Sequence, residues 1–122
     1  MIQINKKKKR LEINMTAFQM GKDLCVILTG GHTPHLGAVT VGSQAKVLQT
    51  FAFEQHKENI VTEIFGNILR REFGGSFAIC CGIHLDNISS EEITDSIEFC
   101  REIAEELCCL LKKCEGIICE LI

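Results

Sequence analysis

The spacing of the apolar residues changes near residue 57, and this change limits the folds available to the chain. Before residue 57, apolar residues alternate with polar ones or form short runs bounded by glycine and polar residues, as in β-strands. After residue 57, they mostly recur every three or four residues, as in helices that cover an apolar layer. Strands followed by helices predict an α+β fold: a largely antiparallel β-sheet with two main helices packed on one face. The 122 residues are expected to form one domain, 1–122.

Five segments have the composition of strands. They are residues 11–15, 24–28, 36–41, 47–53 and 76–83. Small and polar residues at 42–45 suit a hairpin turn, so the first four strands are expected to form an antiparallel meander.

Two segments have the spacing of amphipathic helices. The first is expected to run from residue 57 to a glycine pair after Phe73. The second begins where Ser89 and Glu92 form a capping box, and its apolar stripe starts at Ile93. The apolar tail at 117–122 is expected to add a last strand or to cover a sheet edge.

Composition excludes several classes of function. The net charge of −3 argues against a nucleic-acid partner. The basic run at 6–10 is expected to be a solvated strand end or a fraying terminus, without an assigned role. No apolar stretch is long enough to cross a membrane, and no export signal is recognisable, so we expect a cytoplasmic protein. The eight cysteines are then expected to be reduced thiols, most of them small core residues.

The segment 29–39 concentrates residues with chemical uses in one loop. Glycines 30 and 31 let successive backbone N–H groups cradle an anion such as phosphate, and Pro34 would hold the loop in shape. His32 and His35 could bind phosphate, move a proton or ligate a metal. The alternative is a tight strand connection with surface histidines.

A second such segment, 82–87, leaves the last strand and enters the second helix. His84 and Asp86 alternate, so on extended backbone their side chains would point the same way. The alternative is ordinary loop polarity, with Asp86 or Asn87 shaping the turn. Because both segments lie at strand ends, their convergence favours a functional site. His56 stands apart and is expected to be exposed.

Signatures of catalysis are absent from the sequence. It contains no nucleophile elbow, Walker loop or dinucleotide fingerprint. A nucleophilic role for Cys25 or Cys80 is disfavoured because burial in an apolar strand raises the pKa of a thiol. Glutamates are expected mainly on solvated helix faces, which leaves no convincing acid and base pair. Phenylalanine is the only large aromatic for stacking, and we expect Phe51, Phe53 and Phe77 in the core.

The two loop segments resemble the prenylated flavin chaperone family named after LpdD. The resemblance rests on Gly-Gly-His-Thr-Pro-His-Leu-Gly-Ala at 30–38 and on Gly-Ile-His-Leu-Asp-Asn at 82–87, followed by Glu-Glu-Ile at 91–93. With the order of strands and helices, it covers nearly the whole chain. The ligand-contacting residues that it implies are Gly30, Gly31, His32, Pro34, His35, Gly37, His84 and Asp86.

The resemblance implies a non-catalytic protein that binds prenylated FMN or FMN, stabilises it and helps deliver it to a flavin-dependent decarboxylase. A flavin prenyltransferase is a further expected partner. The family is also similar in fold to proteasome assembly chaperones, which are small α+β dimers, and this implies a homodimer.

Two other functions stay open at this point. The first is a metal-dependent enzyme in which His35, His84 and Asp86 hold a divalent metal. A flavin phosphate held through that cation would combine both functions. The second is an assembly factor that binds a partner protein through an exposed sheet or helix face.

Overall fold

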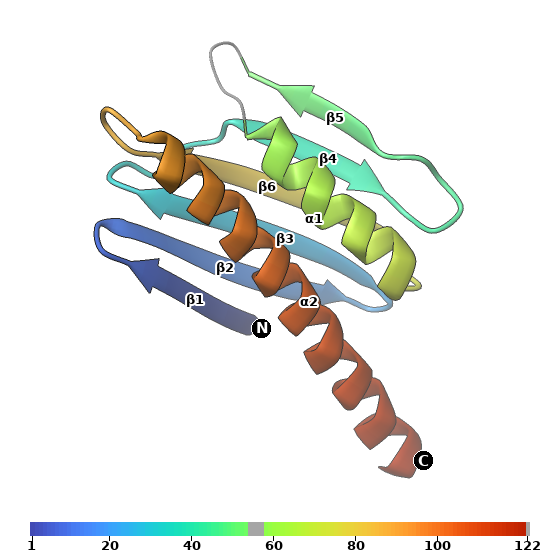
Figure 1. Cartoon of the computed structure of the whole chain (residues 1–122). Coiled ribbons are helices and arrows are strands. Elements are labelled where there is room, and N and C mark those ends of the chain that lie inside the picture. The colour runs from blue at the N-terminus through green and yellow to red at the C-terminus, as the bar shows by residue number, and fades with distance from the viewer. Residues whose placement is uncertain (54–57, 122) are drawn as a thin grey trace.

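The computed structural model describes residues 1–53 and 58–121, with only the backbone described for 114–121. It is an α+β fold, in which a six-stranded sheet is covered on one face by two helices (Figure 1), as predicted. In chain order the elements are β1 (Ile2–Lys8), β2 (Leu11–Met20), β3 (Asp23–Gly31), β4 (Ala38–Gly42), β5 (Gln49–Ala52), α1 (Asn59–Glu72), β6 (Phe77–His84) and α2 (Ser90–Leu121).

The strand order is β1-β2-β3-β6-β4-β5, and the predicted meander is therefore wrong. Strand β6 lies between β3 and β4, parallel to β3 and antiparallel to β4. The other neighbouring pairs are antiparallel. Strand β6 therefore separates β3 from β4 at the centre of the sheet. The chain leaving β3 must consequently cross the end of β6 to reach β4.

The core lies between the sheet and the two helices. Alternate residues of β2 face it, and all four are almost fully buried: Leu11, Ile13, Met15 and Ala17. Helix α1 contributes Phe65 and Leu69, and α2 contributes Ile103 and Leu107. The predicted α2 stripe begins too early, because the side chain of Ile93 is 46% exposed. The first turn of α2 therefore projects beyond the core.

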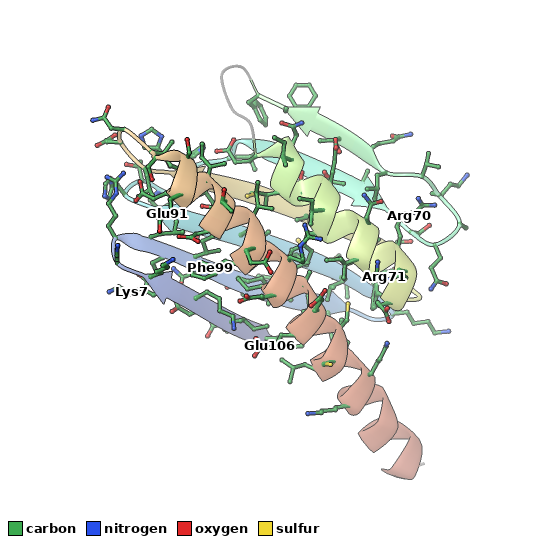
Figure 2. All side chains as sticks on the ribbon, in the orientation of Figure 1. Lys7, Arg70, Arg71, Glu91, Phe99 and Glu106 are labelled. Atoms are coloured by element: carbon green, nitrogen blue, oxygen red, sulfur yellow. The ribbon has the colours of Figure 1, made fainter. Side chains whose placement is uncertain are left out.

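The basic run at 6–10 has a structural role that its sequence did not indicate. It forms the end of β1 and the turn into β2, so the expected strand end is confirmed, although β1 itself was not predicted. Lys6 lies 3.5 Å from Glu106, and Lys8 lies 3.2 Å from Asp95. Glu106 and a further partner of Lys8, Glu91, are labelled on α2 in Figure 2. Lys6 and Lys8 therefore face the acidic side of α2.

Helix α2 begins with the predicted capping box. The Glu92 N–H donates to Ser89 Oγ at 3.1 Å, and the Ser89 N–H donates to Glu92 Oε1 at 3.0 Å. Arg10 adds two hydrogen bonds to the same carboxylate, at 2.6 and 2.7 Å. These bonds, led by those from Arg10, lower the pKa of Glu92 from 4.5 to about 2.

The lowered pKa of Glu92 should make the stability of the protein depend on pH in the acid range. A lowered pKa gives a stabilisation that is complete above pH 4.5 and is lost as the pH falls towards 2. We therefore expect wild type to lose stability more steeply across this window than Glu92→Gln, as measured by urea unfolding at a series of pH values. Lys7→Gln, on the β1 face turned away from α2, should keep the wild-type profile. Parallel profiles for wild type and Glu92→Gln would contradict this account.

The apolar tail after Gly116 is helical, so the predicted last strand is wrong. Its backbone continues α2 to Leu121, and the last turns run past the sheet (Figure 1). One glycine costs a helix only about 1 kcal/mol and does not end it. Residue 122 lies outside the described residues. Within the part of the chain that the structure describes, no helix is both long and apolar enough to span a membrane.

Candidate functional site

The two predicted loop segments meet at one edge of the sheet. Strands β3 and β6 run parallel, so their carboxyl ends lie side by side, with Gly31 paired to His84. His32 directly follows β3, and His84 is the last residue of β6. The connection 32–37 then crosses the end of β6. Clefts outside the carboxyl ends of parallel strands are a common place for ligand sites.

Close packing where the connection 32–37 crosses the end of β6 explains why three positions are glycine. A Cβ atom on Gly82 would overlap the carbonyl oxygen of His35, and one on Gly31 would overlap that of His84. Gly31 also has a φ of +78°, which glycine adopts without strain. A Cβ atom on Gly37 would overlap the carboxylate of Glu58. These glycines therefore allow the two segments and the start of α1 to pack directly against one another.

Two backbone N–H groups of the first loop are used by the fold. The His32 N–H donates to the His84 carbonyl at 2.7 Å, and the Gly37 N–H donates to the Cys81 carbonyl at 2.8 Å. Neither bond leaves its N–H available to an anion, so the expected cradle does not form at these two groups. Ligand contact by the glycines stays a prediction, and the side chains are the better candidates.

Three histidines and one aspartate gather above this crossing. The imidazole rings of His35 and His84 meet edge to face, with centroids 6.2 Å apart. His84 Nε2 lies 3.0 Å from one Asp86 oxygen, and His32 Nδ1 lies 3.8 Å from the other. The His32 and His84 side chains are 44% and 50% exposed. Asp86 thus joins two imidazoles that a ligand can reach, while His56 lies outside the described residues.

Glu58 is a site residue that the sequence did not indicate. Its side chain is 9% exposed, so the expectation of solvated glutamates is wrong here. Its Oε1 lies 2.8 Å from His35 Nε2, while His35 Nδ1 lies 3.2 Å from the Thr33 carbonyl oxygen. An acidic residue at a helix start is common and points to no particular partner. These two contacts fix the orientation of the His35 ring.

Burial disfavours the thiolate form of Cys80, Cys100 and Cys108. Burial raises the pKa of Cys80, raises that of Cys100 to about 12 and raises that of Cys108 to about 11. Cys81, Cys100 and Cys108 are buried, as expected of core cysteines, whereas Cys109 is exposed. The six cysteines with described side chains are all free thiols.

The predicted metal set is not assembled. Among the side chains that the structure describes, those of residues 1–53 and 58–113, no three His, Cys, Asp or Glu residues are grouped so that they could hold a metal ion. His84 and Asp86 are together, but the Nε2 atom of His35 lies against Glu58 instead.

Two aromatic side chains beside the crossing are exposed, against expectation. Phe51 is 63% exposed and Phe53 is 42% exposed, whereas Phe77 is buried as predicted. The two exposed rings meet at 4.9 Å between centroids, and the Phe53 N–H donates to the Gly37 carbonyl at 2.9 Å. A short edge strand leaves its outer side chains uncovered, which alternation alone could not show. The pair therefore lies next to the first loop.

Comparison with known proteins connects this site to a family. The profile of the prenylated flavin chaperone LpdD-like domain matches residues 7–112, a range that contains both loop segments. The chain belongs to this family. This LpdD-like chain is also 29% identical over 93 residues to Protein LpdD of Lactiplantibacillus plantarum, covering 72% of this chain and 68% of that protein. The predicted resemblance is therefore confirmed, and a chaperone role follows at the level of the family.

Proposed function

We propose that this chain binds prenylated FMN, or FMN, at the edge where β3 and β6 end, and delivers it to a flavin-dependent decarboxylase. The observation that carries the proposal is the gathering of three histidines from two distant segments, in which the exposed His32 and His84 lie beside the mostly buried His35. Membership of a prenylated flavin chaperone family supports the choice of ligand. The chain would act as a non-catalytic accessory protein.

The residues present fit a flavin through their side chains. Imidazole N–H groups are donors suited to a phosphate or to a ring carbonyl, and Asp86 and Glu58 orient them. The exposed Phe51 and Phe53 offer faces for an aromatic ring. The flavin would supply the redox-active ring system, and this chain would bind, orient and shield it.

The same proposal includes the partners of the protein. A flavin prenyltransferase would be the source of the cofactor, and the decarboxylase its destination, both in the cytoplasm. The chain would act as a homodimer. The family description supports the cofactor most strongly, and the partners follow from what a carrier of that cofactor must meet.

Anaerobic titration of the purified protein with reduced prenylated FMN and with FMN tests the proposal. We expect wild type to bind one flavin per site, and His32→Ala and His84→Ala each to weaken binding about tenfold, equivalent to about 1.4 kcal/mol. Lys22→Ala, in the turn at the opposite end of β3, is the matched control and should bind like wild type.

Three results would count against the proposal. Failure of the wild type to take up either flavin would reject it. Equal flavin binding by His84→Ala and wild type would contradict the proposed location of the flavin at this edge of the sheet. Stoichiometric divalent metal in the same preparations, with no flavin, would favour the metal-dependent enzyme instead.

A further inference from the structure

Three threonine hydroxyls form a chain of hydrogen bonds from the edge of the sheet to helix α1. Thr40 Oγ1 on β4 donates to Thr62 Oγ1 on α1 at 2.7 Å, and Thr62 Oγ1 donates to the Asn59 carbonyl at 3.2 Å. Thr50 Oγ1 on β5 lies 2.8 Å from Thr40 Oγ1. A hydroxyl has one proton to donate, so Thr50 is the donor in this last bond. Thr40 and Thr62 are both 0% exposed, so water cannot replace the bond between them.

The chain ends in the first turn of α1 and ties this turn to the sheet. Among the described residues, no side-chain hydrogen bond caps the helix at Glu58. The Thr62 N–H donates to the Glu58 carbonyl at 3.0 Å, which closes the turn. The Thr62 hydroxyl binds the same turn at Asn59. Thr62 therefore connects the backbone of Glu58 to β4 through Thr40.

The bond between the two buried hydroxyls joins the same two segments as the contact between His35 and Glu58. His35 lies in the loop that enters β4 at Ala38, and Glu58 directly precedes α1. Thr62 follows Glu58 by about one helical turn, which is about 6 Å along the helix axis. Two neighbouring hydrogen bonds therefore set how α1 lies along β4 (Figure 1). A shift of α1 that broke the bond from Thr40 would also move Glu58 relative to His35.

Apolar packing alone would not fix this position. A Cβ on Gly66, about one turn beyond Thr62, would lie 3.4 Å from Thr40 Cγ2, so helix and strand are close together there. Apolar contacts of this kind are non-directional. A hydrogen bond between hydroxyls holds its two oxygens between about 2.5 and 3.0 Å apart. Because a buried hydrogen bond adds little net stability, the main contribution of this pair is to position α1.

We propose that Thr40 and Thr62 are positioning residues of the flavin site. They hold Glu58 where its carboxylate orients the His35 imidazole. Both threonines are fully buried, so neither touches the ligand. The inference rests on the proposed function for its ligand, whereas the geometry that it describes belongs to the flavin-free protein. Thr50 should matter less, since Thr40 keeps its acceptor when Thr50 is replaced.

NMR of the flavin-free protein with ¹⁵N-labelled histidine tests the positioning directly. A carboxylate accepts hydrogen bonds, so the His35 Nε2–H donates to Glu58 Oε1, and its signal should be protected from exchange with water. In the double variant Thr40→Val with Thr62→Val, this proton should exchange about tenfold faster. Thr40→Ser keeps the hydroxyl and should keep the wild-type exchange rate. His35→Gln assigns the signal.

Urea unfolding separates positioning from a loss of stability. Valine has the shape of threonine, and the double variant removes both partners of the bond, so its stability should be close to that of wild type. Ile103→Val removes one methyl group from the buried face of α2 and is the matched control. It should lower the stability but leave the His35 exchange rate and flavin binding unchanged.

Flavin titration measures the consequence for the site. The dissociation constant of the double variant should rise about fivefold, which is less than the tenfold rise expected when a histidine is removed. Thr40→Ser and Ile103→Val should bind flavin like wild type. Circular dichroism checks that each variant folds. If the double variant does not fold, Thr40→Val and Thr62→Val carry the same comparison singly.

Several results would overturn the inference. It fails if the His35 proton is unprotected in wild type, or if it exchanges equally fast in wild type and the double variant. It also fails if Thr40→Ser or Ile103→Val loses the protection, or if the double variant binds flavin like wild type. If wild type binds neither flavin, the proposed function fails, while the exchange rates still decide whether the two threonines position His35.

Discussion

Gly82→Ala is expected to lower the free energy of unfolding by about 3 kcal/mol, an effect typical of severe overpacking. The added Cβ would overlap the His35 carbonyl oxygen, which belongs to backbone and cannot rotate away. The crossing segment would have to lift from the end of β6. His35 would then move relative to His84, so flavin binding should weaken in the same variant.

Gly74→Ala is the matched control for this substitution. A Cβ at Gly74 meets nothing within 4 Å, and its φ is not positive, so the change should be within about 0.5 kcal/mol of wild type. Urea unfolding of the two variants at neutral pH measures the difference. Equal stability of Gly82→Ala and Gly74→Ala would contradict the crossing as described.

Glu58→Ala is expected to cost about 3 kcal/mol, because it removes one partner from a mostly buried pair. The side chain of Glu58 is 9% exposed and its Oε1 lies 2.8 Å from His35 Nε2. Truncation leaves the imidazole without this contact and opens space beside Gly37. Glu58→Gln keeps the size of the side chain and one carbonyl oxygen, so it should lower the free energy of unfolding by less than Glu58→Ala does.

Glu63→Ala supplies the comparison, since Glu63 is an exposed glutamate of the same helix α1. The free energy of unfolding of Glu63→Ala, measured by thermal or urea unfolding, should be within about 0.5 kcal/mol of the wild-type value. If Glu58→Ala and Glu63→Ala lost the same stability, Glu58 would have no special part in holding His35.

Local patterns predicted most of the elements. The alternation of Leu11, Ile13 and Met15 marked β2, and the capping box of Ser89 and Glu92 marked the start of α2. Both signals come from residues near in sequence. The order of the strands depends on pairings between distant residues, and the local pattern therefore could not show that β6 separates β3 from β4.

The grouping of residues in the candidate site was predicted only in part, for the same reason. Uncommon residue types at strand ends identified His32, His35 and His84, and the structure brings them together. Glu58 was missed because its role depends on a partner 23 residues away. The glycines were assigned to an anion cradle, whereas packing between the crossing segments accounts for Gly31 and Gly82. The sequence alone could not distinguish a glycine that binds an anion from one that allows close packing of two segments.

The most direct test of the cofactor-carrier function is a native mass spectrum of the protein coexpressed with a flavin prenyltransferase and purified without oxygen. The chain has no Trp or Tyr, so a bound flavin would also dominate the absorbance spectrum. We expect the chain mass plus one prenylated flavin, with a smaller flavin-bound fraction in His84→Ala and the wild-type fraction in Lys22→Ala. A colourless protein of bare chain mass would contradict it.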